Sequence, residues 1–371
     1  MKVLYVVNSS GFFCSHFLTL AKKVHEEGCK VYVIAGDDIE RKLIEQSGLN
    51  FFCINLSRSG KNPFREIFFL YQLRAQIIKI RPDIIHTFTV KPIIYTGLVL
   101  KATLSKIVVC NSITGLGSSY LAKGIFGRCI WFFIKFLYKT ALSIPGAIAI
   151  FENKDDKDLF LQWGLSSEEN SRIVNGAGID TSIFLPSQIK NKEITVVLVA
   201  RLLKDKGISE YITAASALKE MTEGVRFQLV GDIDSNNISS MSYEMIKSSH
   251  DKGCIEWLGR RDNIAEIYAS AHIACLPSYR EGLPKSLIEA ASCGLPIITT
   301  DVPGCRQMVK HGDNGLLIPP HSSEAIVEAV KYLIAHPEVM ERMAESSRSM
   351  AINKFDHAHV IKSFFDIYKL T

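Results

Sequence analysis

Short apolar runs alternate with longer amphipathic stretches along the whole chain. Apolar runs of strand length occupy 2–7, 30–35, 51–55, 83–87, 106–110, 147–151, 194–200, 225–230, 272–276 and 296–300. Between them, patterns of helical period cover segments such as 15–27, 64–80, 207–222 and 322–335. Strands that alternate with helices predict an α/β protein with parallel sheets and helices on both faces of each sheet.

A polar segment at 186–193 interrupts this alternation once. We interpret it as a linker, because 371 residues are enough for two domains that each have their own core. The expected domains are 1–186 and 187–356, each doubly wound, with a cleft between them. Ligands of such domains bind beyond the carboxyl ends of the strands, so the loops after the strands are the candidates for binding chemistry.

The composition, with 47% hydrophobic and 22% charged residues, is that of a globular protein. The chain starts with a buried-strand pattern that lacks the cleavage site of a signal peptide. No uncharged apolar run reaches the roughly 20 residues that span a bilayer. The nine cysteines are scattered singly without zinc-site spacing, which favours reduced thiols and a cytoplasmic location.

Positive charge is concentrated in the first domain. Residues 41–150 include 15 Lys and Arg but only three carboxylates, and 84–151 has no carboxylate at all. Such a one-sided field attracts anionic membranes, nucleic acid or phosphorylated substrates. No nucleic-acid motif accompanies the charge, so we expect no nucleic-acid partner.

The segment 124–139 lies in this basic region and is rich in Trp, Phe and Ile. On a helix, Arg128, Lys135 and Lys139 would fall on one stripe. Two interpretations are open. The segment is either a core helix with a thin exposed edge or an interfacial helix that rests on anionic lipid headgroups.

Two glutamates, Glu281 and Glu289, stand eight positions apart in the stretch 277–296, which reads PSYREGLPKSLIEAASCGLP. Pro284 suits the first position of a helix, where N–H groups and the helix dipole form an anion site. One carboxylate would lie in the loop over that site and the other on the helix behind it. A nucleotide sugar, with hydroxyls on either side of its phosphates, would satisfy these groups together. An ordinary strand–helix turn with two solvated glutamates is the alternative, and periodicity alone favours it.

The residues around both glutamates resemble the E-x7-E signature of the retaining glycosyltransferases called family 4, which have the GT-B fold. Pro-Ser precedes Glu281, Glu-Gly-x-Pro surrounds it, and Glu-Ala-x-x-x-Gly-x-Pro begins at Glu289. The resemblance implies two Rossmann-like domains with an interdomain cleft, and a last helix, 357–370, that returns to the first domain. It implies that Glu281 holds the sugar ring or stabilises oxocarbenium character, and that Glu289 binds ribose hydroxyls. The neighbouring donor-site residues that it implies are Gly282, Leu283 and Pro284.

A basic loop follows the first strand of the second domain and carries Arg201 and Lys206. Two cations in a strand–helix loop suit a diphosphate, although a solvated basic loop would have the same sequence. The family has a similar Arg-x-x-x-x-Lys-Gly here, which implies that both cations hold the nucleotide diphosphate. The segment 254–263 is similar to the family loop that packs on the nucleobase, around Leu258 and Arg260. An ordinary strand, turn and helix would also account for this segment.

The loop after the first strand, 8–16, has a single glycine, Gly11, where many family members have Gly-Gly. It is not a dinucleotide fingerprint. The resemblance implies that Gly11 and Thr114 belong to the donor site, although many relatives have His in place of Thr114. On the acceptor side it implies His16 and His86. A lone histidine at the end of a strand is more often structural, and this alternative applies to His86.

Further similarities concern a branch of the family. Phe12, Phe13 and His16 resemble members that build O-antigen and related bacterial surface glycans on a lipid carrier. The patterns at 115–120 and 62–64 are similar to transferases of N-acetylhexosamine, N-acetylgalactosaminyltransferases in particular, that act on undecaprenyl-diphosphate-linked sugars.

A helix start is predicted at Asn153, whose side chain would cap the helix while Asp155 and Asp156 match its dipole. We prefer this interpretation to a metal site. No isolated D-x-D motif stands in a donor loop, so we expect no requirement for a divalent ion.

The sequence therefore leads to the hypothesis of a retaining glycosyltransferase without cofactor or metal, with Glu281, Arg201 and Lys206 as catalytic residues. Its donor would be a UDP-sugar that carries an N-acetylhexosamine or a hexose, and its acceptor a lipid-linked saccharide for O-antigen or capsule. It would be cytoplasmic and would associate peripherally with the inner face of the cytoplasmic membrane through its basic first domain, around 124–139.

Three alternatives remain. A non-catalytic partner of another transferase would tolerate loss of Arg201 or Glu289. A nucleotide-sugar epimerase of the same fold would lack the arrangement of Glu281 and Glu289. A Rossmann oxidoreductase would need a dinucleotide fingerprint, which the sequence does not contain.

Overall fold

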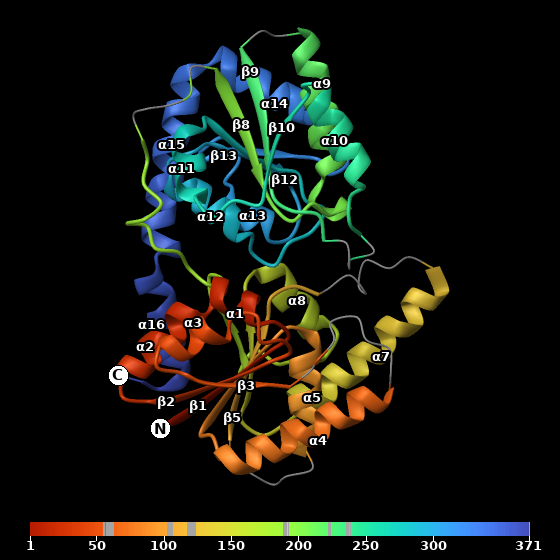
Figure 1. Cartoon of the computed structure of the whole chain (residues 1–371), viewed down its shortest axis with the longest axis vertical. Helices are drawn as coiled ribbons and strands as arrows, with labels where there is room; N and C mark the ends of the chain where they lie inside the picture. Colours follow the sequence, from red (N-terminus) through yellow and green to blue (C-terminus); the bar gives the residue numbers. More distant parts are fainter. Residues whose placement is uncertain are drawn as a thin grey trace. The chain divides into compact units, whose positions relative to one another are not determined.

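The computed structural model describes residues 1–54, 56, 63–101, 107–116, 124–187, 191, 193–221, 224–234, 237 and 239–370. The chain forms two compact units, which Figure 1 traces from the N-terminus in red to the C-terminus in blue. Unit 1 consists of Met1–Ala177 together with Val360–Thr371, and unit 2 is Gly178–His359.

Unit 1 is built on a parallel sheet with the strand order β3-β2-β1-β4-β5-β6-β7. Its strands are β1 (Lys2–Val7), β2 (Lys30–Ala35), β3 (Asn50–Cys53), β4 (Ile84–Phe88), β5 (Val108–Ile113), β6 (Ala147–Phe151) and β7 (Ser171–Ile173). Its helices are α1 (Ser10–His16), α2 (Leu18–Glu26), α3 (Arg41–Gln46), α4 (Pro63–Ile80), α5 (Val90–Lys101), α7 (Gly124–Leu142), α8 (Lys154–Gln162) and most of α16 (His357–Tyr368).

Helices cover both faces of this sheet, because successive residues of a strand point to opposite sides. Val3, Tyr5 and Val7 join an apolar cluster with α1, α2 and α16, whereas Leu4 and Val6 join another with α4 and α5. On this second face, α5 contacts both α4 and α7, and Figure 1 shows the three helices as neighbours.

Hydrogen bonds confirm two local features that the sequence predicted for unit 1: the cap of one helix and the return of the last helix to this unit. The side-chain oxygen of Asn153 accepts the N–H of Asp156 at 2.7 Å, so the predicted cap of α8 is confirmed. In α16, the hydroxyl of Tyr368 is hydrogen-bonded to His86 on β4, which fixes the last helix to the sheet of unit 1.

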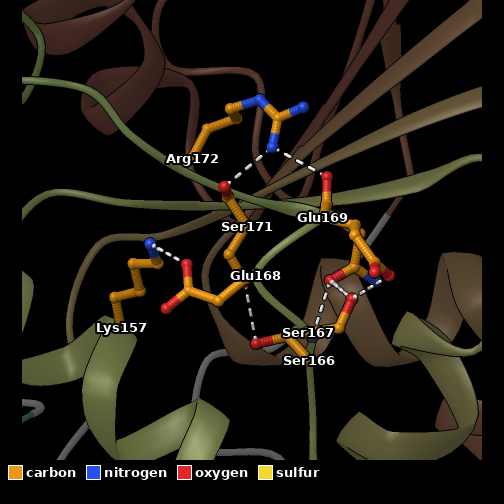
Figure 2. A network of polar contacts seen from close by, with 8 residues as sticks. Lys157, Ser166, Ser167, Glu168, Glu169, Ser171 and Arg172 are labelled. Carbon is orange, nitrogen blue, oxygen red and sulfur yellow. Dashed lines mark hydrogen bonds and ion pairs between the residues drawn. The ribbon is translucent and has the colours of Figure 1, made fainter.

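The edge strand β7 has only three residues and was not predicted from the sequence. Figure 2 shows the polar contacts that hold the segment before it. Lys157 on α8 binds Glu168 at 2.6 Å, and the guanidinium of Arg172 donates to the carbonyls of Glu169 and Ser171 at 2.8 and 2.9 Å. The strand itself is formed by parallel pairing with Ala149–Phe151 of β6, and these side-chain contacts hold the segment that leads into it.

Unit 2 is built on a second parallel sheet with the strand order β10-β9-β8-β11-β12-β13. Its strands are β8 (Ile194–Val199), β9 (Val225–Val230), β10 (Glu256–Gly259), β11 (Ile273–Leu276), β12 (Ile297–Thr300) and β13 (Gly315–Ile318). Its helices are the short η1 (Lys204–Lys206), α9 (Ile208–Met221), α10 (Tyr243–Asp251), α11 (Ile264–Ser270), α12 (Lys285–Ser292), α13 (Cys305–Met308), α14 (Ser323–Ala335), α15 (Pro337–Met350) and the π-helical η2 (Ala351–Phe355).

Both faces of the second sheet are buried as well. Val196 and Leu198 pack in a cluster with α9 and α14, while Val197 between them packs with α11 and α12. The expectation of two doubly wound parallel α/β sheets is therefore confirmed.

The boundary between the units lies before the polar segment at 186–193 that the sequence suggested as a linker. Ile179 and Phe184 pack on the core of unit 2, and Ile179 pairs with Asp356 in an isolated parallel bridge. These contacts assign the residues after Ala177 to unit 2. In the described part of the chain, no helix is both long enough and apolar enough to cross a membrane.

Candidate functional site

The strand order of unit 2 reverses between β8 and β11, which are neighbours in the sheet although two other strands separate them in the sequence. In open α/β sheets, ligands bind at such a switch point, beyond the carboxyl ends of the two strands. The loop after β8 carries Arg201 and Lys206, and the loop after β11 carries 277–284. The topology thus brings the two predicted motifs to one place.

Lys206 and Glu281 are in direct contact across these loops. The Nζ atom of Lys206 lies 2.5 Å from Oε1 of Glu281, and the hydroxyl of Ser278 donates to the same oxygen at 2.6 Å. The two charged side chains are 17% and 11% exposed. A carboxylate that is largely withdrawn from water requires such partners, so Glu281 is held in one orientation at the edge of the site.

The backbones of these two loops and of the loop after β12 pack without space for extra atoms. Gly207, at the end of η1, has φ +72°, and a Cβ atom there would lie 2.1 Å from the carbonyl oxygen of Pro277. Gly304 has φ +81°, and its Cβ would lie 2.6 Å from the carbonyl oxygens of Glu281 and Gly282. The position of Glu281 therefore depends on two glycines outside its own loop.

Arg201 is placed differently from Lys206. Its guanidinium is 3.4 Å from the carboxylate of Asp234, and its side chain is half exposed. A long, solvated ion pair of this kind contributes little, so the guanidinium can turn to another anion at small cost.

The helix α12 begins at Lys285, and Pro284 is its N-cap residue with ψ 106°. This corrects the expectation that Pro284 occupies the first helical position, because an extended ψ lies outside the helical range. The N–H groups of Leu287 and Ile288 both reach the carbonyl of Pro284, at 3.0 and 3.3 Å.

Glu289 lies one turn into α12, on its inner side. It is 13% exposed and its Oε1 atom is 3.3 Å from Nζ of Lys285. Burial raises the pKa of Glu289, and the nearby Lys285 offsets part of this effect. A buried carboxylate with one long ion pair retains capacity to accept further hydrogen bonds.

The predicted nucleobase segment forms β10 and the turn after it. Leu258 is half-buried in an apolar cluster with α11 and α12, while Arg260 is exposed. The indole N–H of Trp257 donates to the carbonyl of Gly231 at 3.0 Å and ties β10 to the end of β9.

In unit 1, two of the predicted residues lie on a helix rather than in a loop. Gly11 and His16 belong to α1, which starts directly after β1, and the ring of His16 stacks on Phe12 with centroids 4.5 Å apart. Thr114 follows β5 and is half-buried. All three stand beyond the carboxyl ends of strands of the first sheet.

His86 lies in the core of unit 1, where its ring has a structural role. It is fully buried, its Nε2 atom is 2.7 Å from the hydroxyl of Ser112, and its Nδ1 atom is bonded to Tyr368. Desolvation lowers the pKa of His86 to about 3, so the ring is neutral. Its position does not support the expected contact with an acceptor.

Sequence reasoning assigned no role to Ser278 or to Tyr279, which lie in the same loop as Glu281. Tyr279 donates from its hydroxyl to Glu210 on α9 at 2.7 Å, and its N–H donates to the carbonyl of Asp205 at 2.9 Å. The Pro-Ser pair before Glu281 was the one available signal for Ser278. Nothing local in the sequence pointed to Glu210, because its contact is tertiary.

Two family models match the chain. One, described as glycosyl transferases group 1, matches residues 180–350, and the other, described as glycosyl transferase 4-like, matches residues 2–151. The matches cover most of unit 2 and of unit 1, respectively.

A similar curated protein is the N,N'-diacetylbacillosaminyl-diphospho-undecaprenol alpha-1,3-N-acetylgalactosaminyltransferase of Campylobacter jejuni. It is 26% identical over 377 residues, which cover 98% of this chain and 97% of the relative. The similarity therefore extends over both units.

Solved structures with the same fold include two that match almost the whole chain. The sucrose-phosphate synthase of Thermosynechococcus elongatus has a TM-score of 0.82 at 18% identity and covers 100% of this chain and 98% of that one. Anabaena HepE in complex with UDP has a TM-score of 0.79 at 17% identity, with 100% of both chains covered. The GT-B fold expected from the sequence is confirmed.

Proposed function

Because the chain belongs to the glycosyltransferases of group 1, with a first domain of the glycosyl transferase 4-like family, we propose that it is a retaining transferase that uses a UDP-sugar. The observation that carries this proposal is the contact between Lys206 and Glu281 beside Arg201 at the switch point of unit 2. A diphosphate needs cations there, and a sugar ring needs a fixed acceptor of hydrogen bonds.

The two cations would hold the diphosphate of the donor. When the bond between the sugar and the diphosphate breaks, negative charge builds on the leaving oxygen, and Arg201 and Lys206 would stabilise it. The acceptor hydroxyl oxygen forms the new bond to the anomeric carbon, and its proton passes to the leaving phosphate. Glu281 would hold the sugar ring or stabilise oxocarbenium character.

The rest of the donor would lie along α12 and β10. Glu289 would accept hydrogen bonds from the ribose hydroxyls, since its carboxylate has capacity beyond Lys285. Leu258 and Arg260 would contact the base, and Gly282, Leu283 and Pro284 would line the phosphates. We propose Gly11 and Thr114 for the donor side and His16 for the acceptor side of unit 1.

We propose that no divalent ion is required, because the two cations supply the positive charge that a metal would supply. In the described part of the chain, no group of three or more His, Cys, Asp or Glu side chains is placed to hold a metal. Activity that persists in a chelator would support this proposal, and activity that depends on an added metal would contradict it.

The proposed acceptor is a lipid-linked saccharide at the cytoplasmic face of the membrane, in the synthesis of O-antigen or capsule. The name of the Campylobacter jejuni relative, an N-acetylgalactosaminyltransferase that acts on an undecaprenol-linked sugar, supports this choice of acceptor and an N-acetylhexosamine donor. We also propose that α7 contacts anionic lipid. It exposes Phe132, Phe133 and Phe136, and Lys139 is exposed beside them.

The proposal is tested by incubating the purified protein with UDP- and GDP-sugars, without metal, and with membrane extract that contains lipid-linked saccharides. Product is followed by mass spectrometry. Lys206→Ala and Arg201→Ala should each lower the rate about 10²- to 10³-fold. Lys204→Ala is the matched control, because this exposed lysine of the same loop has no role in the proposal.

Two other outcomes of this experiment would each favour one of the alternative functions. Conversion of a donor into its epimer without transfer would favour an epimerase. Absence of transfer, of donor hydrolysis and of nucleotide binding would favour a non-catalytic partner of another transferase.

A further inference from the structure

The helix α4 has apolar side chains on two opposite faces, one buried and one exposed. Phe69, Leu73, Ile77 and Ile80 are buried against the sheet of unit 1. On the outer face, Phe64, Ile67, Phe68 and Tyr71 are 81%, 64%, 60% and 68% exposed. These four residues, which we call the outer stripe of α4, are not explained by the core of unit 1.

The spacing of the outer stripe places its members together. Positions 64, 67, 68 and 71 follow the i, i+3, i+4, i+7 pattern of a single helix face. Single exposed apolar side chains are common on soluble proteins, but a continuous stripe of four exposed apolar side chains marks a surface that another molecule covers.

The charges on α4 are cationic. Arg65, Arg74 and Lys79 are exposed on the same helix. The single carboxylate of α4, Glu66, is turned toward α5, where it lies 2.8 Å from Nζ of Lys91 and accepts the hydroxyl of Tyr95 at 2.6 Å. The outward part of α4 is therefore aromatic and positive.

A second exposed aromatic group lies on the same face of the sheet. α5 contacts both α4 and α7, and α7 exposes Phe132, Phe133 and Phe136. The helix layer formed by α4, α5 and α7 (Figure 1) thus presents aromatic side chains from two of its three helices.

We propose that the outer stripe of α4 binds the surface of an anionic phospholipid bilayer. The rings enter the boundary between headgroups and acyl chains, and Arg65, Arg74 and Lys79 lie on lipid phosphates. This proposal rests on the proposed function and deepens it, because it names the element that holds the enzyme at the surface where a lipid-linked acceptor is presented.

The charge of the region favours this occupant over a second copy of the chain. Residues 41–150 include 15 Lys and Arg against three carboxylates. Two copies of the outer stripe, each flanked by Arg65, Arg74 and Lys79, repel each other when they are brought face to face, whereas an anionic bilayer attracts each of them. A bilayer also covers rings and cations at once, as an interfacial helix requires.

The test is sedimentation of the full-length protein with vesicles of phosphatidylglycerol and phosphatidylethanolamine, compared with phosphatidylcholine alone. We expect binding to the anionic vesicles that weakens with added salt. Phe64→Ser/Phe68→Ser should lose about 100-fold in affinity, about tenfold for each ring. Arg74→Gln/Lys79→Gln should lose about 25-fold, since one cation near the surface is worth about 1 kcal/mol.

The matched control is Ile39→Ser. Ile39 is 78% exposed and belongs to unit 1, but it lies outside α4, α5 and α7. We expect it to bind vesicles like the unchanged protein. All variants change exposed side chains, and urea unfolding checks that each is folded.

Vesicle binding that is the same for Phe64→Ser/Phe68→Ser and the unchanged protein would overturn the proposal. So would equal binding to neutral and anionic vesicles. A dimer that the double substitution turns into monomer, with vesicle binding intact, would assign the stripe to a second copy instead. UDP binding, measured on the same samples without vesicles, keeps failure of this proposal distinct from failure of the proposed function.

Discussion

The Nζ atom of Lys206 lies 2.5 Å from the Oε1 atom of Glu281, although the two residues are 75 positions apart in the sequence. They come from the loops after β8 and β11, two strands that are adjacent in the sheet. Both side chains are largely buried, so each charge depends on the other.

We expect the effects of substituting Lys206 and Glu281 on the free energy of unfolding to be coupled. Lys206→Ala leaves the Glu281 carboxylate without its cation and should lower the free energy of unfolding of unit 2 by about 1–3 kcal/mol. Lys206→Ala/Glu281→Ala should recover part of that loss. Urea unfolding followed by Trp257 fluorescence measures both, in a Trp131→Phe/Trp163→Phe background. Strictly additive effects of the single substitutions would contradict the coupling.

Gly207→Ala should disturb the site through its backbone. The new Cβ would lie 2.1 Å from the carbonyl oxygen of Pro277, so the loop that carries Glu281 must move. We expect a stability loss of about 2–4 kcal/mol from strain at positive φ and overpacking together, and loss of UDP binding.

Gly312→Ala is the control for that substitution. Gly312 also has positive φ, +81°, but a Cβ there meets no atom within 4 Å. It should cost only the backbone strain, about 1 kcal/mol, and leave UDP binding unchanged. Equal effects of the two substitutions on binding would show that the contact with Pro277 is unimportant.

Glu289 should make unit 2 less stable as the pH rises. Its pKa is raised in the folded state, so the folded protein holds the proton more tightly than the unfolded chain. Stability is therefore greatest below the ordinary pKa of 4.5 and falls as the pH rises through the raised pKa. Glu289→Gln should be more stable than the unchanged protein at pH 8 but not at pH 4, by urea unfolding.

The protonation of Glu289 should also make the affinity for UDP depend on pH. An ionised Glu289 accepts the ribose hydroxyls, so affinity for UDP should fall as the pH drops below its raised pKa. Glu289→Gln should bind more weakly at high pH and lose this dependence, as measured by calorimetry. Glu328→Gln, an exposed change on α14, should keep the pH profile of the unchanged protein.

His86 should make unit 1 sensitive to acid. Burial lowers the pKa of His86 to about 3, whereas the unfolded chain takes up this proton near 6.5. The stabilising effect of a neutral ring is complete above pH 6.5 and is lost as the pH falls toward 3, by up to about 1.4 kcal/mol per pH unit. His86→Gln should be less stable at pH 7 but should lose less stability between pH 7 and pH 5.

Unfolding of this unit is followed by Trp131 and Trp163, whose rings lie 5.4 Å apart in unit 1. A Trp257→Phe background removes the signal of unit 2. If His86→Gln and the unchanged protein lost the same stability on acidification, another group would be responsible.

The apolar runs predicted most of the sheet because parallel strands are buried on both faces. Residues 2–7 and 225–230 match β1 and β9 without a shift. Three short strands, β7, β10 and β13, are absent from the predicted runs, although a strand was the alternative interpretation of the segment that forms β10. β7 has exposed residues at its second and third positions, all four residues of β10 are only partly buried, and Gly315 opens β13, so none of the three has the pattern of a buried run.

The motifs located the site, but the contacts within it required the fold. The sequence pointed to Lys206 and Glu281 separately, and only the strand order placed them together. The predicted start of α12 was one position too early, because a proline near the start of a helix does not distinguish the N-cap from the first turn. The burial of His86 depends on Tyr368, which stands 282 positions away. For α4, a helix with apolar residues on two faces, periodicity alone could not tell which face is exposed.

The return of α16 to unit 1 also affects how the protein folds during synthesis. Unit 2 is a continuous stretch, 178–359, and can fold as soon as it has left the ribosome. Unit 1 starts first but stays incomplete until 360–371 emerge, so Phe17 and His86 lack their partners on α16 while 178–359 is being made. We expect nascent chains that stop before Val360 to hold a finished second unit and an unfinished first one, which chaperones that recognise exposed apolar surface would retain.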